Sequence, residues 1–228
     1  MLDKKVILAA NHDVGSAQAM IPALKALSSD FTIYPVAWPE SPAFKAFEQA
    51  GLNPPIFSGG RGNPQEIVDL MLGGGLKPSL VLVGISTAND GLETFFLEAK
   101  ANYGYRKISF VFLYETWPHG WLTRPDKKAL YRETADRVLA FDHFSRDEFI
   151  RHGFNPQKVV VTGNPANDDL AAMAVNKETI RKETRDRLGA GLDDTVILYC
   201  STNQDTPENH GTDPSHPRFL GFTEREVM

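Results

Sequence analysis

Short apolar runs rich in β-branched residues alternate along the chain with longer segments of helical periodicity. Each run ends in a polar or glycine-containing turn, a rhythm that is typical of βαβ units and a parallel sheet. The pattern predicts seven strands, at Lys5–Ala10, Phe31–Ala37, Pro55–Ser58, Ser79–Gly84, Ile108–Tyr114, Arg137–Phe141 and Lys158–Thr162.

Helices are expected between these strands. Ser145, with Glu148 three residues later, has the spacing of a capping box at the start of the last one. Strands such as VLVG and FVFLY are apolar on both faces, which implies helices on both sides of the sheet. The fold class is therefore a doubly wound, mostly parallel, seven-stranded Rossmann-like α/β sheet. The predicted helices are Ser16–Ser28, Pro42–Gly51, Pro64–Leu72, Asp90–Tyr103, Pro125–Ala135 and Ser145–His152.

The texture of the sequence changes after Gly163, and this change predicts the domain organisation. Residues 1–165 form the Rossmann-like domain. Residues 166–200 hold a linker, a highly charged solvent-facing helix at 175–188, and the strand Thr195–Cys200 that opens an incomplete second α/β domain. Residues 201–228, rich in polar residues, Pro and Gly, are interpreted as a poorly ordered tail.

Composition narrows the class of protein. The 228 residues carry a net charge of −5 without a Lys/Arg cluster, which argues against nucleic acid as a partner. The single cysteine excludes a disulfide framework and a multi-cysteine zinc site. No apolar run approaches the roughly 18 residues of a membrane span, and the amino terminus turns polar too early for a secretory signal. A cytoplasmic protein without a membrane segment is expected.

Polar side chains follow most of the predicted strands. Ligands of open parallel sheets bind beyond the carboxyl ends of the strands, so we expect the functional site there. The candidates in chain order are Asn11, His12, Asp13, Gly15, Ser16, Ser86, Thr87, Glu115, Trp117, His119, Asp142 and Asn164.

Two of these segments could bind a ligand, one through main-chain N–H groups and the other through an aromatic ring. Gly15 precedes a helix whose free N–H groups could bind an anion, although a plain strand-to-helix turn capped by Asp13 or Ser16 fits equally well. Trp117 lies in a tight Pro/Gly turn where it could stack a sugar or a base, or simply cover the end of the sheet. Asp142 is either a ligand contact or only the residue that begins a helix.

Two residues are candidates for proton transfer. His12 has an imidazole suited to general-base catalysis, although Asp13 beside it need not orient the ring, because neighbours on an extended segment point opposite ways. Glu115 ends the most apolar strand and could accept a hydroxyl proton. Its alternative role is to cap the following segment.

The first strand, its polar turn and the helix AQAMIPALKAL resemble the amino-terminal half of GT-B glycosyltransferases and of the related UDP-N-acetylglucosamine 2-epimerases. Arg151–Leu170 (RHGFNPQKVVVTGNPANDDL) resembles the end of that half, and Lys177–Cys200 resembles the start of the nucleotide-binding half. Two subfamily motifs are absent. NHDVG stands where the epimerases have GTRPE, and the GGTGGH turn of the lipid-linked N-acetylglucosaminyltransferases does not occur.

This resemblance implies the acceptor-side domain of a GT-B-type glycosyltransferase. His12 or Glu115 would act as base on a hydroxyl-bearing acceptor, with no metal or other cofactor, while a missing or separate second domain holds the nucleotide sugar. The alternatives are a fragment of a UDP-N-acetylglucosamine 2-epimerase-like enzyme and a non-catalytic binding or assembly module.

The short second domain implies that the chain by itself is inactive. Truncation of a longer gene product explains it most simply. A partner subunit could instead supply the rest, as in the split eukaryotic N-acetylglucosaminyltransferase. Apolar surface that a missing domain leaves open would also favour a homo-oligomer.

Overall fold

A computed structural model of the chain describes residues 4–54, 68–69, 72–73, 75–85, 91–103, 108–115, 125–191 and 193–197. The chain divides into two compact units, Met1–Val175 and Asn176–Met228. The first unit contains all strands of the described sheet, and it therefore contains the candidate site.

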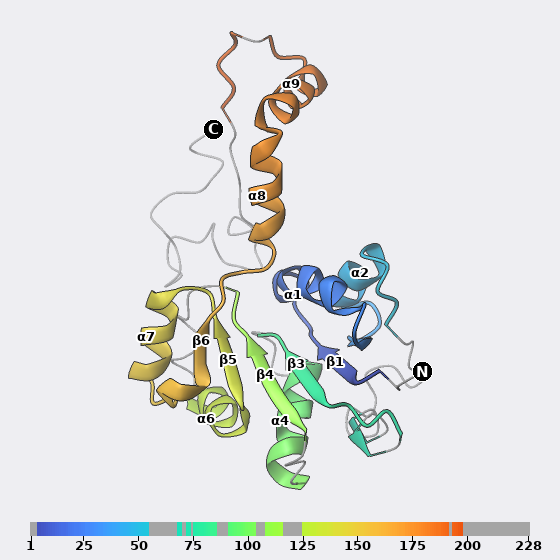
Figure 1. Cartoon of the computed structure of the whole chain (residues 1–228), viewed down its shortest axis with the longest axis vertical. Coiled ribbons are helices and arrows are strands. Elements are labelled where there is room, and N and C mark those ends of the chain that lie inside the picture. The colour runs from blue at the N-terminus through green and yellow to red at the C-terminus, as the bar shows by residue number, and fades with distance from the viewer. Residues whose placement is uncertain are drawn as a thin grey trace, which may run out of the picture. The chain divides into compact units, whose positions relative to one another are not determined.

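The first unit is built on a six-stranded, wholly parallel sheet in the order β2-β1-β3-β4-β5-β6 (Figure 1). The chain runs outward from β1 to β2 and then returns to the other side of β1 for β3. The strand order therefore reverses between β1 and β3, the position at which open α/β sheets bind ligands. The strands are β1 (Val6–Ala10), β2 (Thr32–Val36), β3 (Leu80–Val83), β4 (Ser109–Leu113), β5 (Arg137–Ala140) and β6 (Val159–Val161).

Six of the seven predicted strands are confirmed, and the seventh, Pro55–Ser58, lies outside the described residues. Five predicted helices are confirmed with small shifts at their ends, whereas the prediction at 64–72 lies largely outside the described residues. The described helices are α1 (Val14–Leu27), α2 (Pro42–Gln49), α4 (Leu92–Tyr103), α6 (Pro125–Thr134), α7 (His143–Arg151), the short 3₁₀ helix η2 (Pro156–Lys158), α8 (Asn167–Val175) and α9 (Lys177–Leu188).

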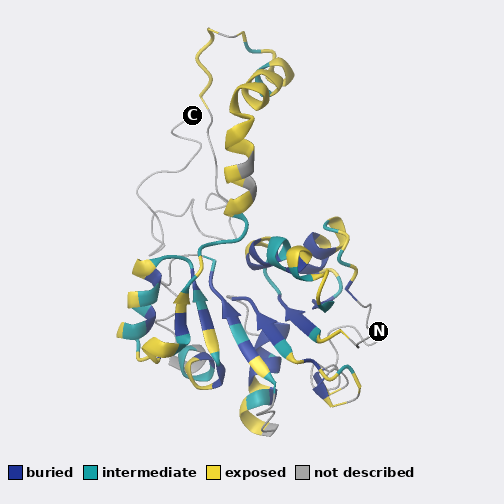
Figure 2. Ribbon diagram, viewed as in Figure 1, coloured by how far each residue is buried: buried dark blue, intermediate teal, exposed yellow. Residues whose placement is uncertain are grey.

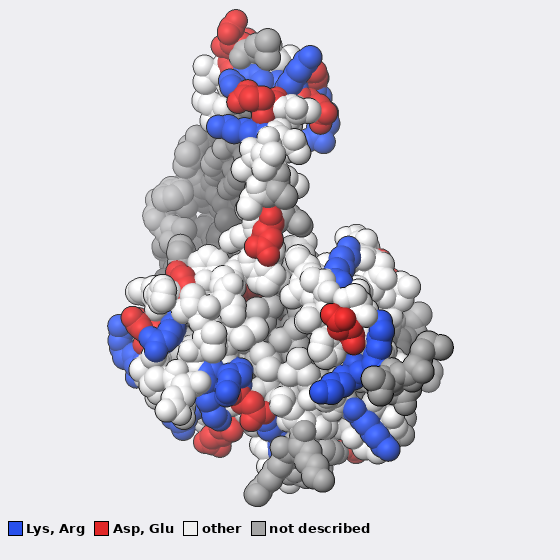
Figure 3. Space-filling view, in the orientation of Figure 1, with Lys and Arg blue, Asp and Glu red and all other residues white. Residues whose placement is uncertain are grey.

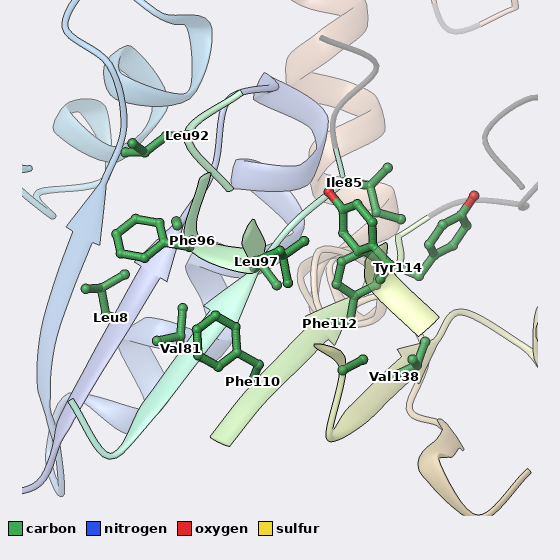
Figure 4. Packing of buried hydrophobic residues seen from close by; sticks show 14 of the residues in the cluster. Leu8, Val81, Ile85, Leu92, Phe96, Leu97, Phe110, Phe112, Tyr114 and Val138 are labelled. Carbon is green, nitrogen blue, oxygen red and sulfur yellow. The ribbon is translucent and has the colours of Figure 1, made fainter. Parts of the chain in front are cut away.

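Each face of the sheet has its own apolar core, as a doubly wound fold requires. Successive side chains of a strand point to opposite faces, so Leu8 joins one core and Ile7 the other. The first core contains Phe96 of α4, and Figure 4 shows this ring beside Leu8 of β1 and near Val81 of β3. The second core packs α1 and α2 on the sheet through Met20 and Phe47. Figure 2 shows the resulting band of buried residues along the central strands.

Edge-to-face aromatic pairs join β4 to the helices of the first core. The ring centroids of Phe112 and Tyr131 lie 4.0 Å apart, and those of Tyr114 and Phe149 lie 4.8 Å apart. Such pairs contribute about 0.5–1.5 kcal/mol beyond the burial of their area. They fix α6 and α7 against the strand whose end carries Glu115.

The predicted capping box at Ser145 is wrong. Asp142 is the N-cap of α7, and its Oδ1 accepts the N–H of Ser145 at 2.7 Å. Ser145 is therefore the third helical residue and is fully buried, while Glu148 forms an ion pair with Arg151. The predicted pattern made the Ser145 hydroxyl the first acceptor of the helix. The ionised carboxylate of Asp142 is a stronger acceptor, and it starts the helix three residues earlier.

The region after β6 differs in part from its prediction. The helix α8 was not expected, because the sequence was interpreted as a linker before the charged helix. The structure leaves its apolar side chains Leu170, Met173 and Val175 exposed. In the second unit, α9 is charged and contains no buried residue, which confirms the predicted solvent-facing helix. Figure 3 shows acidic and basic side chains intermingled on it. The described residues of the expected strand, 195–197, form no strand.

Candidate functional site

The carboxyl ends of β1, β3, β4 and β6 are joined by a small hydrogen-bond network. Ser16, in the first turn of α1, is its centre and is fully buried. Its Oγ accepts the N–H of Ile85, just after β3, at 2.9 Å and donates to Oε2 of Glu115, just after β4, at 3.2 Å. One hydroxyl thus links the first helix to two neighbouring strand ends at the switch point of the sheet.

Glu115 is also held through its main chain. The Nδ2 of Asn164, beyond β6, donates to the carbonyl oxygen of Glu115 at 3.2 Å. The Oδ1 of Asn164 accepts the N–H of Ala166 at 3.0 Å, which orients the amide. The structure therefore brings Ser16 and Asn164 to Glu115 from opposite edges of the site, and both make protein contacts there.

The surroundings of the partly buried Glu115 carboxyl raise its pKa. Burial raises its pKa, and the nearby charge of Asp13 raises it further. A main-chain hydrogen bond and the Ser16 hydroxyl oppose this shift without cancelling it. A raised carboxyl pKa lies closer to neutral pH, where a general acid or base is most effective.

Gly84 is a site residue that the sequence reasoning missed. A Cβ atom at this position would lie 2.4 Å from Oγ of Ser16 and 2.6 Å from Nδ2 of Asn11. Only glycine lets these two side chains approach the end of β3. A glycine that ends an apolar strand at the switch point was the available signal.

The first strand end supplies two more polar side chains. Asn11 is fully buried and its Oδ1 accepts the N–H of His12 at 2.8 Å. Among the described residues, Nδ2 of Asn11 and the buried Nδ1 of His12 have no hydrogen-bond partner. His12 also accepts the N–H of Ala43 at the start of α2 through its carbonyl oxygen, at 3.3 Å. The main chain of His12 is therefore held by the Asn11 side chain and by the start of α2.

Asp13 and Gly15 form the turn into α1. Asp13 is the N-cap residue in an extended conformation, and its side chain makes no capping hydrogen bond. Gly15 is exposed, and a Cβ there would meet nothing within 4 Å. Packing therefore does not require glycine at this position, and anion binding by this turn stays a prediction.

The remaining candidates lie apart from this network or outside the described residues. Asp142 caps α7, and a role in ligand binding stays a prediction. Among the residues that the structure describes, no group of three or more His, Cys, Asp and Glu side chains could hold a metal ion. None of the described helices has the length and hydropathy to cross a membrane. Ser86, Thr87, Trp117 and His119 lie outside the described residues.

The parallel sheet and its switch-point site define a Rossmann-like α/β protein. No family model and no curated protein matches the chain. Its fold is similar to solved UDP-N-acetylglucosamine 2-epimerases.

Three solved structures illustrate the likeness. The Rickettsia bellii enzyme has a TM-score of 0.57 at 14% identity, over 84% of this chain and 52% of that one. The Neisseria meningitidis enzyme, bound to UDP-GlcNAc, has a TM-score of 0.53 at 18% identity, over 85% and 56%. The Methanocaldococcus jannaschii enzyme, in complex with UDP-GlcNAc and UDP, has a TM-score of 0.51 at 17% identity, over 72% and 47%.

These identities establish a shared fold, and the resemblance noted in the sequence is confirmed at that level. The chain spans about half the length of the structures it matches.

Proposed function

We propose that this chain is the part of a nucleotide-sugar-processing enzyme that carries a proton-transfer group, Glu115. One observation carries the proposal. A partly buried carboxyl with a raised pKa is held at the switch-point edge of the sheet by Ser16 and Asn164. Such perturbed groups in preorganised surroundings are typical of catalytic acids and bases.

The solved structures support a nucleotide sugar as the substrate class. The Neisseria meningitidis and Methanocaldococcus jannaschii enzymes hold UDP-GlcNAc, and this chain covers about half of each. In the proposal, further residues of a longer gene product or a partner chain hold the nucleotide, and the edge around Glu115 faces the sugar.

The reaction favoured by the fold is inversion at carbon 2 of the sugar. Such an inversion can proceed by loss of the hydrogen on this carbon as a proton and its return on the other face. The electron pair of the broken C–H bond then forms a double bond between carbons 1 and 2 as UDP leaves carbon 1, and the return of UDP and the proton reverses this step. Glu115 is suited to such a transfer, and His12 is the second candidate because its Nδ1 has no partner among the described residues.

Glycosyl transfer is the second candidate function. It is favoured by the turn after β1, where NHDVG replaces the GTRPE of the epimerases. In that reaction Glu115 or His12 would take the proton of an acceptor hydroxyl. The two reactions differ in whether turnover requires an acceptor.

The test uses the natural gene product, purified with any chain that accompanies it. It is incubated with UDP-GlcNAc in D₂O, first alone and then with free sugars or a lipid extract as acceptors, and followed by NMR. Deuterium at carbon 2 without an acceptor supports epimerisation, whereas UDP release that requires an acceptor supports transfer.

Variants assign the reacting group. Glu115→Gln is expected to reduce turnover by at least about 10²-fold, the usual contribution of a general acid or base. The matched control is Glu98→Gln, on an exposed position of α4, which is expected to leave turnover unchanged. His12→Ala tests the second group in the same assay. Full turnover of Glu115→Gln would remove Glu115 from the mechanism.

A further inference from the structure

Two serines occupy the same position in two helices but have different surroundings. Ser16 and Ser145 are each the third residue after an aspartate N-cap, and each is fully buried. The hydroxyl of Ser145 has no hydrogen-bond partner among the described residues, whereas that of Ser16 has two. The helix position alone does not account for the contacts of Ser16.

The two bonds of Ser16 have a fixed direction. A hydroxyl has one proton to donate, and the Ile85 N–H can only be a donor to it. The proton of Ser16 is therefore left for Oε2 of Glu115, which is 3.2 Å away. A donor aimed at a carboxylate stabilises the ionised form more than the neutral form.

Packing holds the hydroxyl in this geometry. The backbone of Gly84 passes so close to Oγ of Ser16 that a Cβ there would lie at 2.4 Å. On the other side Asn164 holds the main chain of Glu115. Ser16 and Asn164 therefore restrain the carboxylate and the backbone of the same residue.

We propose that Ser16 is a positioning residue for Glu115. The hydroxyl of Ser16 accepts the N–H of Ile85, lies against the backbone of Gly84, and thereby holds one carboxylate oxygen of Glu115 in place. This assigns Ser16 a role different from the ligand contact that the sequence suggested. The role matters for catalysis only if Glu115 is the reacting group, so in that respect it rests on the proposed function. The hydrogen bond itself is testable without any turnover.

The test is a pH titration of the Glu115 carboxyl carbon by NMR in the full chain, for wild type, Ser16→Ala and the control Ser145→Ala. Loss of the donor is expected to move the Glu115 midpoint to higher pH in Ser16→Ala. Ser145→Ala is expected to titrate like wild type, because its hydroxyl makes no such bond. An unchanged midpoint in Ser16→Ala overturns the proposal.

A second measurement needs no variant to fold. In the wild type, the amide proton of Ile85 is expected to shift with the same midpoint as Glu115, because Ser16 connects the two groups. An Ile85 signal that is insensitive to the Glu115 titration also overturns the proposal.

Activity separates this proposal from the proposed function. In the assembled enzyme, Ser16→Ala is expected to move the acidic limb of the kcat profile to higher pH and to leave KM unchanged. Full activity of Glu115→Gln together with a moved Glu115 midpoint in Ser16→Ala would retain the positioning role and reject the proposed function. A moved midpoint without a moved kcat profile would reject the catalytic consequence.

Discussion

Gly84→Ala is the substitution whose cost the structure defines best. The new methyl group would lie 2.4 Å from Oγ of Ser16 and 2.6 Å from Nδ2 of Asn11, distances that real Cβ atoms do not adopt. Overpacking of a filled interior costs about 1–3 kcal/mol. If Ser16 moves away, the buried N–H of Ile85 also loses its acceptor, which costs about 1–3 kcal/mol more.

The free energy of unfolding is therefore expected to fall by about 2–6 kcal/mol, a large part of the roughly 5–15 kcal/mol of an ordinary protein. Urea unfolding monitored by circular dichroism measures this change. The control is Gly15→Ala, where a Cβ meets nothing within 4 Å and the better helix former is expected to be neutral or stabilising by up to about 1 kcal/mol.

A double variant tests the mechanism of the loss. Ser16→Ala removes the closest atom, so adding it to Gly84→Ala should cost less than the sum of the two single changes, while the contact with Asn11 remains. This account of the strand ends is refuted if the free energy of unfolding of Gly84→Ala lies within about 0.5 kcal/mol of the wild-type value, which is roughly the error expected for additivity.

Three further predictions concern charges and caps. Burial raises the pKa of Asp136, but its hydrogen bonds, above all the one from Lys100, lower this pKa below its ordinary value. The ionised Asp136 should therefore stabilise the protein at neutral pH. Asp136→Asn is expected to cost about 1 kcal/mol after solvent screening, a difference that disappears as the pH of urea unfolding falls through the lowered pKa. Asp142→Ala is expected to cost about 0.5–2 kcal/mol by loss of the α7 cap, whereas Ser145→Ala should be nearly neutral in the same assay; the reverse ranking would restore the capping box. The raised pKa of Glu115 means that its contribution to stability is present below the pKa of the unfolded chain and is lost as pH rises through the folded value. Glu115→Gln should therefore gain stability relative to wild type with increasing pH, and a pH-independent difference would contradict the shift.

The sequence predicted which residues lie at the strand ends but not what they contact. Asn11, Ser16, Glu115 and Asn164 were all placed at the carboxyl edge, because each follows an apolar run, and the structure brings them together there. Their partners could not be read from spacing. Ser16 and Glu115 lie 99 positions apart, and only the strand order makes them neighbours.

Local signals were also insufficient where two patterns competed. Either Asp142 or Ser145 could cap the start of α7, each by accepting an N–H group three residues later. The carboxylate of Asp142 is the stronger acceptor and is the cap in the structure. Gly84 resembled any glycine at the end of a strand. Its requirement became visible only when two side chains from the other side of the switch point were found against its backbone.

The sequence by itself determined the fold class, because hydrophobic periodicity records which faces of each element must be buried. The alternation of apolar runs and helical segments was sufficient for a doubly wound parallel sheet. The tertiary structure decided the order of the strands and therefore which strand ends meet at the switch point. It also decided the state of Glu115, since burial, the charge of Asp13 and the Ser16 hydroxyl act on this carboxyl through space and not along the chain.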